Sequence, residues 1–262
     1  MDRGQSRNPV RLALAWPTRL RKRTRGPPRP LLRCRSVPPC HPARQRSGAI
    51  FFEEEDYTQY RNWLIEASET QGLAVHAYVF MTNHVHLLVT PEGANSLPRA
   101  MQSLGRRYVR AINAKYRRTG TLWEGRYRAA PIDSDNYFFS RCRYIELNPV
   151  RARMVAHPRQ YRWSSYRAHA ECKEDALTAF HSVFRRLGRT VEARQDAYRN
   201  LFKGTLDAGF IDALRTATNG GWALGGERFK KEIARAAKRR VAPLPPGPRP
   251  ASRKDARQVQ LF

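Results

Sequence analysis

The sequence predicts an α+β fold, because two strand patterns lie between two helix patterns. Residues 74–81 and 84–90 are rich in β-branched and aromatic residues, and the polar pair Thr82-Asn83 separates them as the turn of an antiparallel hairpin. Apolar residues spaced three and four apart predict helices before and after this pair. We therefore expect an antiparallel sheet with helices on one face, followed by a helical extension.

The first two helices follow from charge and periodicity. The acidic run 53–56 suits a helix N-terminus, where the helix dipole favours negative charge, and apolar positions continue from there to Ala67. The second helix is expected from Ser96 to about Lys115, with an apolar stripe on one side.

The rest of the chain alternates between short elements and breaks. Residues 122–132 are predicted to form a loop and a strand, and residues 133–135 form an N-cap region for a third helix at about 136–147. An irregular segment containing 163–166 follows. Further helices are predicted at about 175–187, 190–202, 207–217 and 226–239.

The two ends differ in composition from the middle. Residues 1–48 are rich in Arg and Pro, and we expect them to be disordered, as we do the Pro-rich basic tail 241–262. This leaves a predicted domain at 49–170 and a helical extension at 171–240.

The formal net charge of +27 points to a polyanionic partner. Residues 1–48 hold thirteen basic residues and one acid, so the other 214 residues still carry +15. The sequence has no apolar run of membrane-spanning length and no lipidation signal, so we favour nucleic acid over an anionic membrane.

The four cysteines have spacings unlike a disulfide framework, and no convincing secretory signal precedes them. We therefore expect reduced thiols and a cytoplasmic protein. Cys34, Cys40 and His41 loosely suggest zinc, but their spacing fits no good zinc template.

Two histidines share one face of a predicted strand. The strand period of two places His84 and His86 side by side and turns Val85 to the other face. Two imidazoles so placed can ligate one divalent metal. Taken alone, the pattern suits two polar residues on a solvated sheet face better.

Tyr144 and Asn148 are one turn apart near the end of the third helix, on a different side from the core stripe of Phe138, Cys142 and Ile145. A phenol and an amide oxygen so placed can serve as nucleophile and metal ligand. On these residues alone we prefer the alternative, in which an aromatic ring packs at the core edge and Asn caps the helix before a proline.

Four motifs in order resemble a known family. They are His76-Ala-Tyr-Val-Phe-Met-Thr-Asn-His-Val-His-Leu-Leu-Val-Thr-Pro91, Thr121-Leu-Trp-Glu-Gly-Arg-Tyr127, Arg143-Tyr-Ile-Glu-Leu-Asn-Pro-Val-Arg-Ala-Arg153 and Trp163-Ser-Ser-Tyr166. Together they resemble the single-tyrosine HUH transposases, and more specifically the REP-associated tyrosine transposases with their IS200-like domain. The resemblance is close over about 49–170, and the part after it looks like the helical extension of many members.

The resemblance implies a ferredoxin-like α+β unit and a transposase that cleaves and rejoins single-stranded, hairpin-flanked DNA through a 5′-phosphotyrosine. Tyr144 would be the nucleophile, and His84, His86 and Asn148 would ligate magnesium or manganese. The partner would be single-stranded or hairpin DNA, bound by a monomer or a homodimer, with no membrane involved.

Eight arginines are candidates for phosphate contacts, and each also suits a solvated surface. They are Arg99, Arg106, Arg107, Arg110, Arg117, Arg118, Arg126 and Arg128. Three other tyrosines compete with Tyr144, but none has Asn or Gln four residues later. We expect Tyr108 to pack in the core, and Tyr116 and Tyr127 to stack or pack.

One feature departs from the family. Members usually begin with a strand that leads into an Arg-Gly-Asn-like turn just before the Phe51-Phe52 region, and residues 1–48 do not resemble that strand. A shifted reading frame or a wrongly chosen start would account for this composition. Without the strand, the sheet would lose a member and expose an edge.

Three alternatives stay open. The chain can be an inactive relative that binds hairpin DNA without cutting it, or an unrelated basic nucleic-acid-binding protein in which the His pair is incidental. A replication initiator or relaxase would also use an HUH metal site, but usually with a third His.

Overall fold

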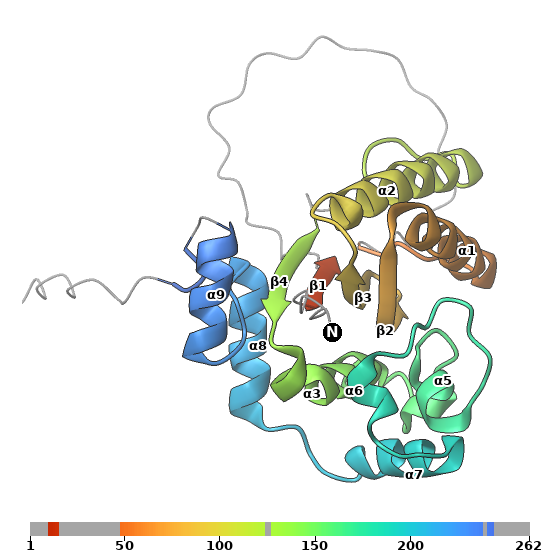
Figure 1. The fold of residues 1–262 in the computed structure, drawn as a ribbon. Helices are drawn as coiled ribbons and strands as arrows, with labels where there is room; N and C mark the ends of the chain where they lie inside the picture. Colours follow the sequence, from red (N-terminus) through yellow and green to blue (C-terminus); the bar gives the residue numbers. More distant parts are fainter. Residues whose placement is uncertain (1–9, 16–47, 124–126, 238–239, 244–262) are drawn as a thin grey trace, which may run out of the picture.

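The computed structural model describes residues 10–15, 48–123, 127–237 and 240–243, without the side chains of residues 10–15, 134 and 135. Its centre is a four-stranded antiparallel sheet in the order β2-β3-β1-β4 (Figure 1). The strands are β1 (Val10–Ala15), β2 (Leu73–Met81), β3 (His84–Pro91) and β4 (Arg128–Ile132). The predicted hairpin is β2–β3, with Met81 opposite His84 at its turn.

Two helices cover one face of this sheet (Figure 1). They are α1 (Glu54–Gln71) and α2 (Ser96–Lys115), which pack on each other and on β2. Their buried side chains include an aromatic cluster, in which the Tyr60 ring contacts Phe80 of β2 and Tyr108 of α2, both edge-on. The order βαββαβ with this strand arrangement is the ferredoxin-like unit, so the predicted fold class is confirmed.

Helices also cover the opposite face, which corrects the expectation of helices on one face only. The main one is α3 (Ser134–Glu146), whose Phe138, Cys142 and Ile145 are buried against Ala77 and Leu88 of the sheet. The physical reason lies in β2 and β3, which are buried on both faces. A strand that is apolar on both sides needs a covering layer on each.

The first strand comes from the segment that we expected to be disordered. Val10–Ala15 lies between β3 and β4, with Leu14 opposite His86 and Leu12 opposite both Leu88 and Ala130. The predictions of disorder here and of a missing strand are therefore wrong for these six residues. The stretch is free of proline and lies between two strands whose backbone groups it pairs with, so tertiary pairing overrides its weak local pattern.

The rest of the predicted disorder, at 1–9, 16–47 and 244–262, lies outside the described residues, as do Cys34, Cys40 and the suggested zinc site. The prediction of disorder is wrong at Val241, which is buried and whose carbonyl accepts a hydrogen bond from Ala223 N. The other two cysteines are free thiols: Cys142 is buried and Cys172 is exposed.

The chain after α3 forms short elements and then longer helices. They are α4 (Asn148–Arg151), the 3-10 turn η1 (Pro158–Gln160), α5 (Tyr166–Glu171), α6 (Ser182–Arg185), α7 (Val191–Leu201), α8 (Ala208–Gly220) and α9 (Glu227–Ala237). The helix predicted at 175–187 is only the single turn α6. Asp175 holds the chain before it in a turn, because its carboxylate accepts hydrogen bonds from Leu177 N and Thr178 Oγ1.

Segments of the extension and of the Trp163–Tyr166 motif cover both edges of the sheet. Phe80 N donates to the Trp163 carbonyl and Ser165 N to the Tyr78 carbonyl along β2, at 2.9 and 3.0 Å. Leu224 bridges Ile132 along β4. These hydrogen bonds hold the 163–166 segment in place although it is irregular. Together with the Leu224 bridge they also cover sheet edges that would otherwise be open to aggregation. Within the described part of the chain, every helix is too short or too polar to cross a membrane.

Candidate functional site

The two histidines of the hairpin lie on the α3 side of the sheet. Their rings are 4.7 Å apart between centroids and nearly perpendicular, whereas Val85 belongs to the opposite core beneath α1 and α2. His86 is fully buried and His84 is half-buried. The strand period thus places both imidazoles together, as predicted.

Burial keeps both rings neutral at physiological pH. Burial lowers the pKa of His84 to about 4. It also holds the pKa of His86 well below the ordinary range, and the nearby positive charges of Arg151 and Arg141 lower that pKa further. Neutral imidazole is the form that binds metal ions.

Asn83, in the hairpin turn, orients one of these rings. Its Oδ1 lies 2.7 Å from His84 Nδ1, so this nitrogen carries the proton and the lone pair belongs to Nε2. The sequence pattern identifies Asn83 only as a turn residue. Its place directly before the His pair was the signal that could have identified it.

Tyr144 projects from α3 toward the same histidines. Its ring centroid is 5.9 Å from that of His86, and only 2% of the residue is exposed. The guanidinium of Arg151 lies 4.0 Å above the tyrosine ring and donates a hydrogen bond to the Tyr144 carbonyl at 3.0 Å. Arg151 lies in the motif of residues 143–153, but nothing in the sequence distinguishes it from the other arginines.

Asn148 begins α4, one turn beyond Tyr144. Its Nδ2 is 3.4 Å from the Tyr144 carbonyl, which is a capping contact at the end of α3. The amide therefore caps the helix that bears Tyr144, as the alternative interpretation of the sequence requires.

The chemistry of these donors fits a divalent metal. Two neutral imidazoles lie side by side, and an amide oxygen on the adjoining helix end would complete a set suited to manganese or magnesium. In the described ranges, no three His, Cys, Asp or Glu side chains gather into a metal-holding group. A third protein ligand would therefore be of another type, such as Asn148.

A second buried cluster lies on the other side of α3 and escaped the sequence analysis. Glu146 accepts hydrogen bonds from Ser165 Oγ at 2.6 Å, His169 Nδ1 at 3.0 Å and the Tyr198 hydroxyl at 2.7 Å. All four residues are buried. This Glu146 cluster ties the tyrosine helix to α5 and α7, and only the fold brings its members together.

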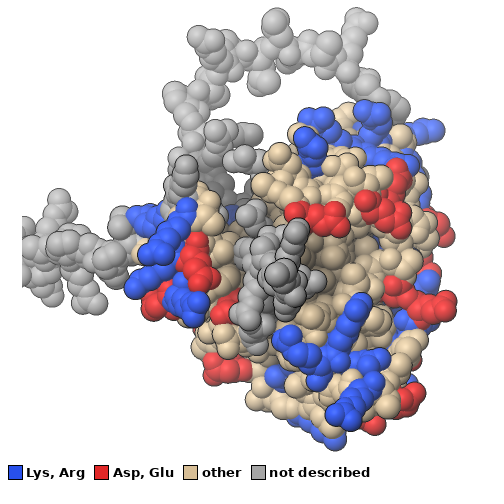
Figure 2. Space-filling view, viewed as in Figure 1, with Lys and Arg blue, Asp and Glu red and all other residues tan. Residues whose placement is uncertain are grey.

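Most of the arginines predicted to contact phosphate lie on an exposed surface along α2. Arg99, Arg106, Arg107, Arg110, Arg117 and Arg118 are all exposed on or just after α2, where Figure 2 shows blue side chains gathered. Arg107 pairs with Glu66 at 2.6 Å and stacks over Trp63. Arg128 instead donates to Asn219 Oδ1 at 2.9 Å, and Arg126 lies outside the described residues.

The competing tyrosines have structural partners. Tyr108 is fully buried and donates to the Ile50 carbonyl at 2.7 Å, and Tyr116 donates to Asp56 at 2.8 Å. Tyr127 is half-buried against the aromatic core. Their expected packing is confirmed.

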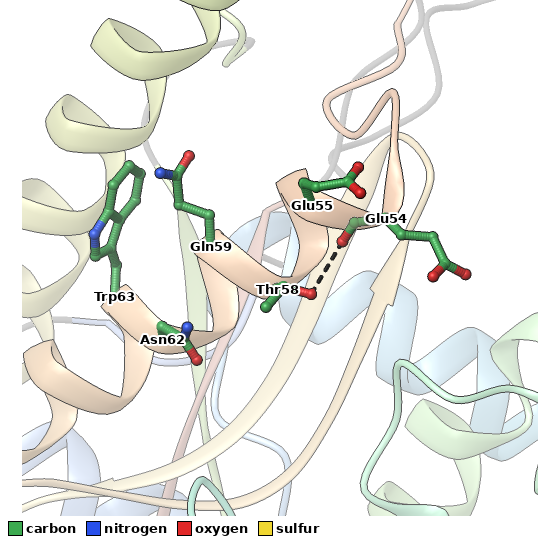
Figure 3. Close-up of a pocket in the computed structure, with 6 residues that line it drawn as sticks. All are labelled: Glu54, Glu55, Thr58, Gln59, Asn62 and Trp63. Carbon is green, nitrogen blue, oxygen red and sulfur yellow. Dashed lines mark hydrogen bonds between the residues drawn. The ribbon is translucent and has the colours of Figure 1, made fainter.

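A surface hollow of about 400 Å³ lies along one side of α1 (Figure 3). It is lined by Glu54, Glu55, Thr58, Gln59, Asn62 and Trp63. Its two carboxylates would repel a phosphate, so it is a poor nucleic-acid site.

A comparison with protein-family models supports the resemblance. Residues 44–148 match the family described as "Transposase IS200 like". A solved structure of a REP-associated tyrosine transposase bound to a REP hairpin aligns with a TM-score of 0.45 and 15% identity, covering 70% of this chain and 92% of that chain. No curated protein matches. The family recognised from the motifs is the one whose model matches this chain, and the match extends over residues 44–148.

Proposed function

We propose that this transposase-family chain cleaves and rejoins single-stranded, hairpin-flanked DNA through a phosphotyrosine on Tyr144. The observation that carries the proposal is the proximity of three rings: the centroid of His86 lies 4.7 Å from that of His84 and 5.9 Å from that of Tyr144. A nucleophile beside two neutral imidazoles is the arrangement that metal-assisted phosphoryl transfer needs.

The protein's residues divide the work. His84 and His86 would hold the divalent ion with Asn148, and their depressed pKa values keep them unprotonated for that purpose. When bound, magnesium or manganese draws charge from the scissile phosphate. Arg151 holds the ring and backbone of Tyr144, which limits the directions from which the phenol oxygen can approach phosphorus.

The proposed step is an in-line exchange at phosphorus. Tyr144 Oη forms a bond to phosphorus, the bond from phosphorus to the 3′ oxygen breaks, and the proton lost by the phenol is balanced by the one that the 3′ oxygen gains. Attack by another 3′-OH reverses the step and reseals the strand without ATP. Burial of Tyr144 and His86 would keep water from hydrolysing the intermediate.

Covalent trapping tests this proposal. Labelled hairpin DNA from the protein's own locus is incubated with Mn²⁺ and the protein, and the products are separated on a denaturing gel beside Tyr144→Phe. We expect an adduct with the native protein and none with Tyr144→Phe, with Tyr116→Phe as a control that still forms it. An adduct that persists in Tyr144→Phe would assign the nucleophile elsewhere.

A second candidate function is favoured by one observation. His86 and Tyr144 are 0% and 2% exposed, so neither side chain is open to DNA in this conformation, which favours a protein that binds hairpin DNA without cutting it. Tight binding of the hairpin by folded protein, with no adduct under any metal condition, would establish this alternative.

A further inference from the structure

Arg141 is the largest fully buried side chain in the described part of the chain, and it lies on α3 one turn before Tyr144. Its Nε, Nη1 and Nη2 have no hydrogen-bond partner among the described residues. Five donor hydrogens are thus enclosed without an acceptor.

Such an arrangement is unfavourable for a fold by itself. Burial lowers the pKa of Arg141 to about 9, so the group still carries its charge at neutral pH. A buried charge without a partner destabilises the folded state, which is why buried arginines normally face a carboxylate. The buried carboxylate on the same helix, Glu146, is already occupied by Ser165, His169 and Tyr198.

The position of the unpaired charge identifies its ligand. Arg141 and Tyr144 are three residues apart and share a side of α3, and the charges of Arg141 and Arg151 both act on His86. The planar fork of a guanidinium matches two oxygens of a phosphate. Arg141 therefore presents unpaired donors beside the proposed nucleophile.

We infer that Arg141 is a phosphate-binding residue of this site: its guanidinium receives the DNA phosphate that Tyr144 attacks and then holds the phosphotyrosine. The inference rests on the proposed function for its substrate, but the unpaired buried guanidinium stands independently of it. Substrate phosphate would pair the charge, so the energy lost by burying Arg141 would be recovered on binding.

A stability measurement tests the inference without requiring activity. Arg141→Met keeps the length and removes the charge, so we expect its Tm to rise by about 3 °C. Sodium sulfate, compared with sodium chloride at equal ionic strength, should raise the Tm of the native protein more than that of Arg141→Met. Arg185→Met, at an exposed position of α6, should show neither change. A lower Tm for Arg141→Met with an unchanged sulfate response would assign Arg141 a structural role and overturn the inference.

A kinetic measurement tests the role in the reaction. In the trapping assay, we expect Arg141→Met to slow adduct formation about a hundredfold and Arg141→Lys about tenfold, because lysine keeps the charge but not the fork. Hairpin affinity should also fall in Arg141→Met, because the phosphate loses the guanidinium that pairs with it. Adduct formation by Arg141→Met at the native rate would overturn the inference.

The stability test of Arg141 and the trapping test of the proposed function can fail independently of each other. If the native protein forms no adduct at all, the proposed function fails, and the Tm and sulfate responses still decide whether Arg141 binds a tetrahedral anion.

Discussion

Helix α3 carries two buried charged side chains whose surroundings differ. Glu146 is met by three donors from α5, α7 and the Trp163–Tyr166 motif, at 2.6 to 3.0 Å. Arg141, just over one turn earlier, is as deeply buried and has no hydrogen-bond acceptor among the described residues. On the same helix, therefore, the described part of the fold supplies hydrogen-bond partners for one buried charge, Glu146, and none for the other, Arg141.

The difference between Glu146 and Arg141 separates residues that stabilise the fold from residues that serve the reaction. A satisfied buried network fixes the position of the elements that it joins, whereas an unsatisfied charge lowers stability and persists where a ligand completes it. We therefore expect changes in the Glu146 cluster to affect unfolding first, and changes around Tyr144 to affect the reaction first.

The largest effect is expected from Glu146→Ala. This change removes the acceptor that three buried donors share, so we expect the free energy of unfolding to fall by about 3–5 kcal/mol. Urea unfolding followed by tryptophan fluorescence measures it, and Glu146→Gln, which keeps one acceptor, should lose less. A loss below about 1 kcal/mol in Glu146→Ala would mean that the cluster does not hold α3 in place.

His76 extends the comparison to a neutral group that the fold also satisfies. Its Nδ1 donates to the Ala179 carbonyl at 2.6 Å and its Nε2 lies 2.8 Å from Thr90 Oγ1, and burial lowers its pKa to about 4. The unfolded chain binds this proton near pH 6.5 and the folded chain only near pH 4. Between these values the unfolded state takes up more protons, so stability falls as the pH falls.

We expect His76 to account for about 2 kcal/mol of the stability lost between pH 7 and pH 5. Urea unfolding of the native protein and of His76→Gln at pH 7, 6 and 5 measures it, and the native protein should lose more stability than the variant as the pH falls. Parallel losses would show that His76 takes up its proton equally in both states.

Arg151 tests the other side of the comparison. Its guanidinium stacks 4.0 Å above Tyr144 and orients the phenol, so Arg151→Gln should slow adduct formation about tenfold. The free energy of unfolding should change by less than about 1 kcal/mol. A variant that unfolds easily but traps DNA at the native rate would reverse this assignment.

The predictability of these two regions from sequence also differs. The shared face of His84 and His86 follows from the strand period alone, and the helix bearing Tyr144 from its N-cap and apolar spacing. Their meeting across 58 residues of chain was expected only through the family resemblance. Arg141 could not be singled out among 49 basic residues, because its burial depends on how α3 packs between the sheet and the extension. Likewise, β1 forms by pairing with β3 and β4, and proline and arginine around it hid its pattern.

The smallest effects are expected on the exposed surface of α2. Arg106→Ala and Arg110→Ala should each weaken single-stranded DNA binding a few-fold and reduce the salt dependence of log K by about 0.7, the value for one phosphate contact on a single strand. Arg107→Ala should do less, because Arg107 is already engaged by Glu66 and Trp63. Affinities measured by fluorescence anisotropy between about 50 and 200 mM salt give both quantities. Equal losses for all three variants would mean that DNA displaces the Glu66 pair, and no loss for any would move the DNA path off α2, leaving the buried charge of Arg141 as the phosphate contact to test first.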